Sequence, residues 1–210
     1  MGSAVERSGD DVDRTALPGI VRSAVMLGAI EATVVVLLSF ITRLTGGIVE
    51  AVIGGIVLVA GLALVSMLPG LWTRARTIEG IAGAAGIGLA AAVVFLLIDV
   101  SILQPIGIYT NRWREIGGGS NWWYHPVWWM AGTFLPWMGA LILAAQADRG
   151  SKPSMFNAMI VALVATVLFG TVASLVHFPG AHWGLGTFGV AFLPGIAAAA
   201  AVMSLRPSRA

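Results

Sequence analysis

Six apolar stretches, separated by short polar connections, account for most of this chain. Hydrophobic residues make up 58% of its 210 residues and charged residues only 10%, which is more apolar than a soluble core can enclose. A helix needs about 20 mostly apolar residues to cross the roughly 30 Å hydrocarbon layer of a membrane. The six stretches cover approximately 19–41, 48–68, 78–103, 126–145, 156–176 and 186–205. We therefore predict an all-α, polytopic integral membrane protein with a bundle of six transmembrane helices.

The basic residues alternate between rich and poor connections, which predicts an orientation in the membrane. Short connections that are rich in Lys and Arg stay in the cytoplasm. With the N-terminus inside, three cations face outward, namely Arg43, Arg112 and Arg114. The other nine then lie in the cytoplasm: Arg7, Arg14, Arg22, Arg74, Arg76, Arg149, Lys152, Arg206 and Arg209. Both termini are therefore expected to be cytoplasmic.

The domain organisation follows from the same pattern. Residues 1–18 form a polar cytoplasmic tail, 19–205 a six-helix transmembrane domain with an aromatic outer loop at 104–126, and 206–210 a short cytoplasmic tail. One lysine beside eleven arginines, with abundant Ala and Gly, is typical of a GC-rich bacterial genome. We therefore expect the bacterial cytoplasmic (inner) membrane as its location.

Two classes of function are excluded by composition. The chain has no cysteine, so disulfides, thiolate chemistry and iron–sulfur ligation are absent. No connection combines a dense run of Lys or Arg with interleaved aromatic residues, and nucleic acid is therefore not expected as a partner.

Small residues at intervals of four predict where helices approach closely. The third helix carries Gly80, Ala84 and Gly88 in such a ridge, and the second carries Ala51 and Gly55. Ridges of this kind let two helix backbones come together in a membrane, so we predict that these two helices pack on each other. The fourth and sixth helices contain internal prolines, which predict kinks that act as hinges or as simple bends.

Two acidic residues fall within the apolar stretches. Glu31 lies nine residues beyond Arg22, roughly 13 Å deep, where a carboxyl favours its neutral form. It is either a proton carrier or ligand-binding group, or a protonated carboxyl bonded to a neighbouring helix. Asp99 lies near the outer end of the third helix.

Aromatic residues gather at the predicted outer side. An interfacial aromatic belt is one explanation, since the tryptophan ring is apolar with one polar edge. The alternative is a binding surface for a lipid, a pigment or a partner subunit. The residues in question are Trp113, Trp122, Trp123, Trp128, Trp129 and Trp183.

All three histidines are expected on this outer side too. His177 and His182 occupy one turn, and together with His125 and Asp99 they could supply nitrogen and oxygen ligands for zinc, copper or non-haem iron. Facing histidines could also hold a haem. The other interpretation is that these imidazoles bond to the backbone or to lipid headgroups.

Two functions from different classes remain open. The first is a non-catalytic integral or accessory subunit of a larger membrane complex, with the lipid bilayer and other membrane subunits as partners. The second is a membrane-embedded metal-dependent or proton-dependent enzyme or transporter, with an outer-face histidine site and Glu31 as proton carrier. The sequence contains no catalytic or phosphate-binding motif that decides whether the chain is an enzyme.

Overall fold

The computed structural model describes residues 16–109 and 124–205, with only the backbone described at 124–126. Within these ranges the chain forms long helices and no strand. One short segment continues the third helix as a π-helix, in which the backbone hydrogen bonds span five residues instead of four. The elements are α1 (Leu17–Leu44), α2 (Gly47–Trp72), α3 (Ile78–Ile98), η1 (Asp99–Leu103), α5 (Tyr124–Asp148), α6 (Met155–Leu175) and α7 (Leu185–Leu205).

The predicted set of six membrane-length helices is confirmed. Six spans in the described part of the chain are long and apolar enough to cross a membrane, and each overlaps one of the stretches predicted from the sequence. The boundaries differ by a few residues, because helix ends extend beyond the most apolar window. Residues 1–15 and 206–210 of the two predicted tails, and 110–123 of the outer loop, lie outside the described residues.

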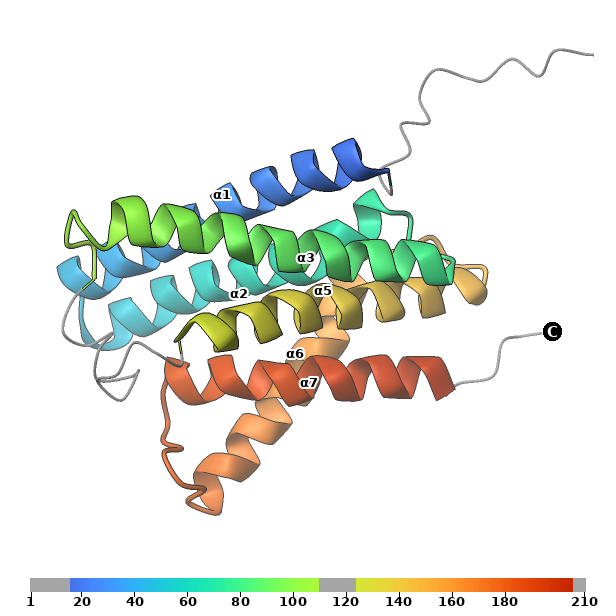
Figure 1. The fold of residues 1–210 in the computed structure, drawn as a ribbon. Helices are drawn as coiled ribbons and strands as arrows, with labels where there is room; N and C mark the ends of the chain where they lie inside the picture. Colours follow the sequence, from blue (N-terminus) through green and yellow to red (C-terminus); the bar gives the residue numbers. More distant parts are fainter. Residues whose placement is uncertain (1–15, 110–123, 206–210) are drawn as a thin grey trace, which may run out of the picture.

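Five of the helices run side by side and one diverges. α3 packs between α1 and α5, α2 packs against α1 and α5, and α7 packs against α5 and α6. Figure 1 shows that α1, α2, α3, α5 and α7 lie roughly along one direction, whereas α6 crosses behind α7 and leaves the bundle at an angle. The start of α1 and the end of α7 lie at the same end of the bundle.

Close helix approach in this bundle depends on glycines of α3 and α5. A Cβ atom at Gly88 of α3 would lie 2.0 Å from the carbonyl oxygen of Gly132, and one at Gly139 would lie 1.9 Å from the carbonyl oxygen of Ser66. The backbone of α5 therefore touches α3 on one side and α2 on the other. Such backbone contact maximises van der Waals packing where no hydrophobic effect drives helices together.

The predicted contact between α2 and α3 is present, but the small-residue ridge of α3 does not make it. Gly88 faces α5, and Gly80 faces the backbone of Thr73 and Ala75 in the preceding connection, while Ala84 clusters with Ala75 and Ala140. α2 and α3 do contact each other, but Gly55 faces Leu185 of α7 and Ala51 is exposed. Small residues determine which face of a helix can come close to another helix. Which helix packs there depends on the shape of the opposing surface.

Prolines occupy the interiors of three helices. Pro136 and Pro194 lie inside α5 and α7 as the sequence predicts, and the kinks expected there stay a prediction. Pro69 lies inside the last turn of α2, which continues four residues beyond the predicted end at Leu68. At the end of the helix, Thr73 donates both its N–H, at 2.9 Å, and its hydroxyl, at 3.0 Å, to the Pro69 carbonyl, which satisfies this terminal carbonyl.

Candidate functional site

The most developed polar site is built around Asp99, where α3 passes into η1. Asp99 has no solvent-exposed surface. One carboxylate oxygen accepts a hydrogen bond from Gln104 Nε2 at 2.6 Å, and the other accepts one from the Tyr109 hydroxyl. The π-helical turn also bonds the Gln104 N–H to the Asp99 carbonyl at 2.9 Å. The extra residue in this turn places Gln104 where its side chain can return to the carboxylate of Asp99.

Two residues of α1 fasten the same segment to the bundle. Arg43 Nη2 donates to the carbonyl oxygens of Gly107 and Ile108, at 2.9 and 3.0 Å, and the Ser39 hydroxyl donates to the carbonyl of Ile108. Gly107 adopts φ +68°, a backbone conformation that glycine reaches without a Cβ clash. This network of Asp99, Gln104, Tyr109, Ser39 and Arg43, called the Asp99 network below, ties the end of α3 to the end of α1.

The geometry of the Asp99 network suits a structural clamp. Both carboxylate oxygens already accept a hydrogen bond, and the side chain is fully enclosed. A buried polar group that is satisfied in this way stabilises a unique arrangement of the helix ends. Coordination of an ion by Asp99 would require this segment to open.

Sequence reasoning placed Asp99 correctly at a helix end but did not predict its partners. The predicted outer loop at 104–126 includes both Gln104 and Tyr109, and it gives neither of them a role beside Asp99. The available signal was a Gln-Pro pair, Gln104-Pro105, directly after an apolar helix that ends with an acid. A buried carboxyl needs hydrogen-bond donors, and a polar side chain in the turns that follow can supply them.

Glu31 lies on the buried face of α1 and is only 6% exposed. Leu27, one turn earlier on this face, packs with Ala91, and Val35, one turn later, packs with Phe95. The carboxyl is therefore enclosed in the apolar interface between α1 and α3. Its Oε2 atom has no hydrogen-bond partner among the described residues.

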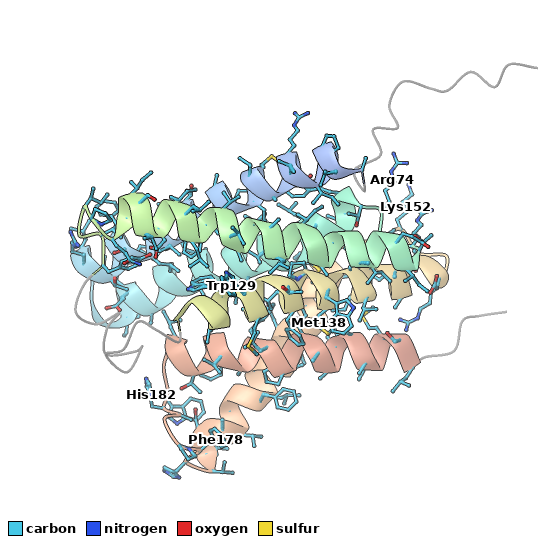
Figure 2. All side chains as sticks on the ribbon, viewed as in Figure 1. Arg74, Trp129, Met138, Lys152, Phe178 and His182 are labelled. Carbon is cyan, nitrogen blue, oxygen red and sulfur yellow. The ribbon has the colours of Figure 1, made fainter. Side chains whose placement is uncertain are left out.

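His177 and His182 lie in the exposed connection between α6 and α7. His177 has φ +54°, and the backbone N–H of His182 donates to Thr187 Oγ1 at 2.9 Å. His182 Nδ1 lies 3.3 Å from the carbonyl oxygen of Gly180. Figure 2 shows His182 and Phe178 at the end of α6 that diverges from the bundle. In Figure 1 this connection is separated from the end of α3 by α5 and α7.

The metal or haem site stays a prediction. Among the described residues, no three His, Cys, Asp or Glu side chains come close enough to hold a metal ion. The side chain of His125, the remaining candidate ligand, lies outside the described residues. Within the described residues, His177 and His182 are therefore the two candidate ligands that share one connection, and Asp99 does not join them.

The predicted aromatic residues occupy different environments. Trp128 is half-buried and packs against Phe95 with ring centroids 4.6 Å apart, so it belongs to the contact between α5 and α3. Trp129 and Trp183 are exposed. Trp113, Trp122 and Trp123 lie outside the described residues.

A polar cavity and an apolar groove lie on the described surface, and none of Glu31, Asp99, His177 or His182 lines either of them. The first, of about 300 Å³, is polar and lies between the α2–α3 and α5–α6 connections. The second, of about 230 Å³, is an apolar groove between α2, α6 and α7. Its lining comprises Gly55, Leu58, Val59, Leu62, Leu163, Thr166, Val167, Leu185, Phe188, Gly189 and Phe192.

Comparison of the chain with protein-family models, curated proteins and solved structures found no match. Its function has to be inferred from the geometry of the described residues.

Proposed function

We propose that this chain is a non-catalytic integral membrane subunit that receives a transmembrane helix of a partner protein in the groove between α2, α6 and α7. The observation that carries this proposal is the groove itself. It forms because α6 packs on α7 and diverges from α2, which leaves apolar faces of α2 and α6 on either side of it. A membrane-embedded groove lined by apolar side chains suits a helix more than a polar substrate.

The glycines that line the groove support docking of a helix. A Cβ atom at Gly55 would meet only Leu185 Cδ2 at 3.5 Å, and one at Gly189 only Leu58 Cδ2 at 3.6 Å. Both positions therefore have room for a side chain. Glycine inside a helix costs about 1 kcal/mol relative to alanine, and glycines that this chain does not need for its own packing give another helix close access to the backbone.

The basic residues support a bacterial inner-membrane protein with both termini in the cytoplasm. Arg74, Arg76, Arg149 and Lys152 lie in the two connections at the end of the bundle where α1 starts and α7 ends. Under the positive-inside rule this end faces the cytoplasm.

Site-specific photo-crosslinking in intact membranes tests the docking proposal. A photoreactive residue at Val59, which lines the groove, should crosslink to a helix of another membrane protein. The same residue at Leu97, which is 63% exposed on α3 but not in the groove, is the control. The substitution Gly55→Leu should abolish the Val59 crosslink, whereas Gly86→Leu, at an open position of α3, should preserve it. Equal crosslinking from Val59 and Leu97, or crosslinks to lipid alone, would contradict the proposal.

A second candidate function is favoured by the buried carboxyl of Glu31, whose Oε2 has no hydrogen-bond partner in the part of the chain that the structure describes. An ionisable residue within a membrane span is costly and often marks a proton pathway. In this alternative the chain is a proton-dependent or metal-dependent transporter or enzyme, with His125, His177 and His182 at the outer face. Metal analysis of the purified protein, compared with His177→Ala and His182→Ala, tests the metal. Proton uptake into vesicles by the wild type, abolished in Glu31→Gln, tests the carboxyl; a metal-free protein without such uptake removes this candidate.

A further inference from the structure

The polar cavity between the α2–α3 and α5–α6 connections has properties that the proposed helix-docking function does not use. It is lined by Arg76 from the first connection and by Ala147, Asp148, Gly150, Ser151 and Lys152 from the second. Two cations from separate parts of the chain therefore face one space of about 300 Å³.

The wall formed by the α5–α6 connection is held by Gln146. This side chain is buried at the end of α5, where its Oε1 accepts the Ser154 N–H at 2.6 Å and its Nε2 donates to the Ser154 carbonyl at 3.3 Å. The Gln146 carbonyl accepts the N–H groups of Arg149 and Ser151 at 3.3 and 3.2 Å. Gly150 completes the turn at φ +70°. These hydrogen bonds of Gln146 hold the backbone at Ser151 and Lys152 in place.

The opposite wall is anchored as well. Ala75 is buried in a cluster with Ala84 and Ala140, and its N–H donates to the Gly70 carbonyl at 2.9 Å. Thr77 caps α3 by accepting the Gly80 N–H at 3.3 Å. Arg76 lies between these two fixed residues, so the base of its side chain is held in place beside the cavity.

Among the described residues, the positive charges at the cavity exceed the negative ones. Arg76 and Lys152 are exposed and make no hydrogen bond or ion pair with any other residue that the structure describes. Asp148 supplies one negative charge against their two positive charges. The Ser151 hydroxyl adds a donor. Figure 2 shows Lys152 at the same end of the bundle as Arg74.

We propose that this cavity binds the phosphate of an anionic phospholipid headgroup. Arg76 would bind two phosphate oxygens through its planar guanidinium, while Lys152 would contribute a point charge and Ser151 a neutral donor. Basic pockets between transmembrane helices at the cytoplasmic side are suited to such headgroups.

A lipid fits this position better than a soluble anion because of where the cavity lies. α2 and α5 end beside it, and α3 and α6 begin beside it. Four membrane-length helices therefore meet the headgroup region at this level. Ile78 and Phe156, near the starts of α3 and α6, are 82% and 73% exposed, so apolar surface for acyl chains begins next to the connections.

Native mass spectrometry of the full chain in detergent, titrated with phosphatidylglycerol or phosphatidylcholine, tests the proposal. The wild type should retain phosphatidylglycerol in preference to phosphatidylcholine. Each cation near an anionic headgroup contributes about fivefold in affinity, so Arg76→Gln with Lys152→Gln should weaken phosphatidylglycerol binding about 25-fold. Arg76→Lys keeps the charge but loses the two-point contact of the guanidinium, so its binding should fall between that of the wild type and that of Arg76→Gln.

Arg22→Gln is the matched control, because Arg22 is an exposed cation of α1 at the same end of the bundle and does not line the cavity. It should leave lipid retention unchanged. An equal loss in this control, no loss in the double variant, or equal retention of the two lipids would overturn the proposal. Binding of inorganic phosphate without any preference for the anionic lipid would also overturn it, since the site would then serve a soluble anion.

Discussion

The contact between α3 and α5 at Gly88 leads to a prediction about stability. A Cβ atom introduced by Gly88→Ala would lie 2.0 Å from the Gly132 carbonyl oxygen and 2.4 Å from Pro136 Cγ. Carbon–oxygen contacts below 3.0 Å are essentially not found for real Cβ atoms, so the two helices would have to separate by about 1 Å. Neither obstacle can move by a simple change of rotamer, because one is backbone and the other a proline ring.

The expected net effect is a loss of about 2 kcal/mol in the free energy of unfolding. Overpacking costs about 1 to 3 kcal/mol, and an obstacle of fixed backbone places this position at the upper end. Replacing glycine by alanine in a helix returns about 1 kcal/mol of helix propensity. Gly86→Ala provides the control, since it lies two residues away on the same helix and a Cβ atom there meets nothing within 4 Å.

Reversible unfolding in mixed micelles, followed by circular dichroism, measures both variants. Gly86→Ala should be neutral or stabilising by up to about 1 kcal/mol, because it gains propensity without a clash. The two variants should therefore differ by about 3 kcal/mol. Equal stabilities would refute the inference that the backbones of α3 and α5 touch at Gly88.

Three further predictions concern buried polar groups and use the same unfolding measurement. Tyr109→Phe leaves one carboxylate oxygen of Asp99 without its donor and should destabilise the protein by about 1 to 3 kcal/mol; an unchanged stability would mean that the Asp99 network is dispensable. Gln146→Leu leaves the Ser154 N–H without its acceptor and should cost about 1 to 3 kcal/mol, together with faster proteolysis at the α5–α6 connection; wild-type protease resistance would mean that Gln146 does not hold this connection in place. Glu31→Met removes an unpartnered buried carboxyl and should stabilise the chain by about 1 kcal/mol or more; a loss of stability would reveal a partner for this group.

Much of the fold could be predicted because hydropathy is a local property of the chain. The lengths of the six apolar runs determine how many helices can cross a membrane, and no tertiary contact is needed to count them. The position of Glu31 within the first apolar stretch is also read from the sequence alone, and the structure places this residue in the buried face of α1. Even here the predicted end of α2 at Leu68 was too early, because a proline in an apolar helix does not have to end it, and α2 continues through Pro69 to Trp72.

The sequence by itself determined an all-helical chain with six membrane-length segments and small-residue faces that permit close approach. Only the tertiary structure decided that the ridge at Gly88 meets α5, that Asp99 pairs with Gln104 and Tyr109, and that α6 diverges to open a groove. Hydrophobic length is a property of consecutive residues. The choice of a packing partner depends on the shapes that distant segments bring together, and the choice of the donors to Asp99 depends on how the chain turns after α3.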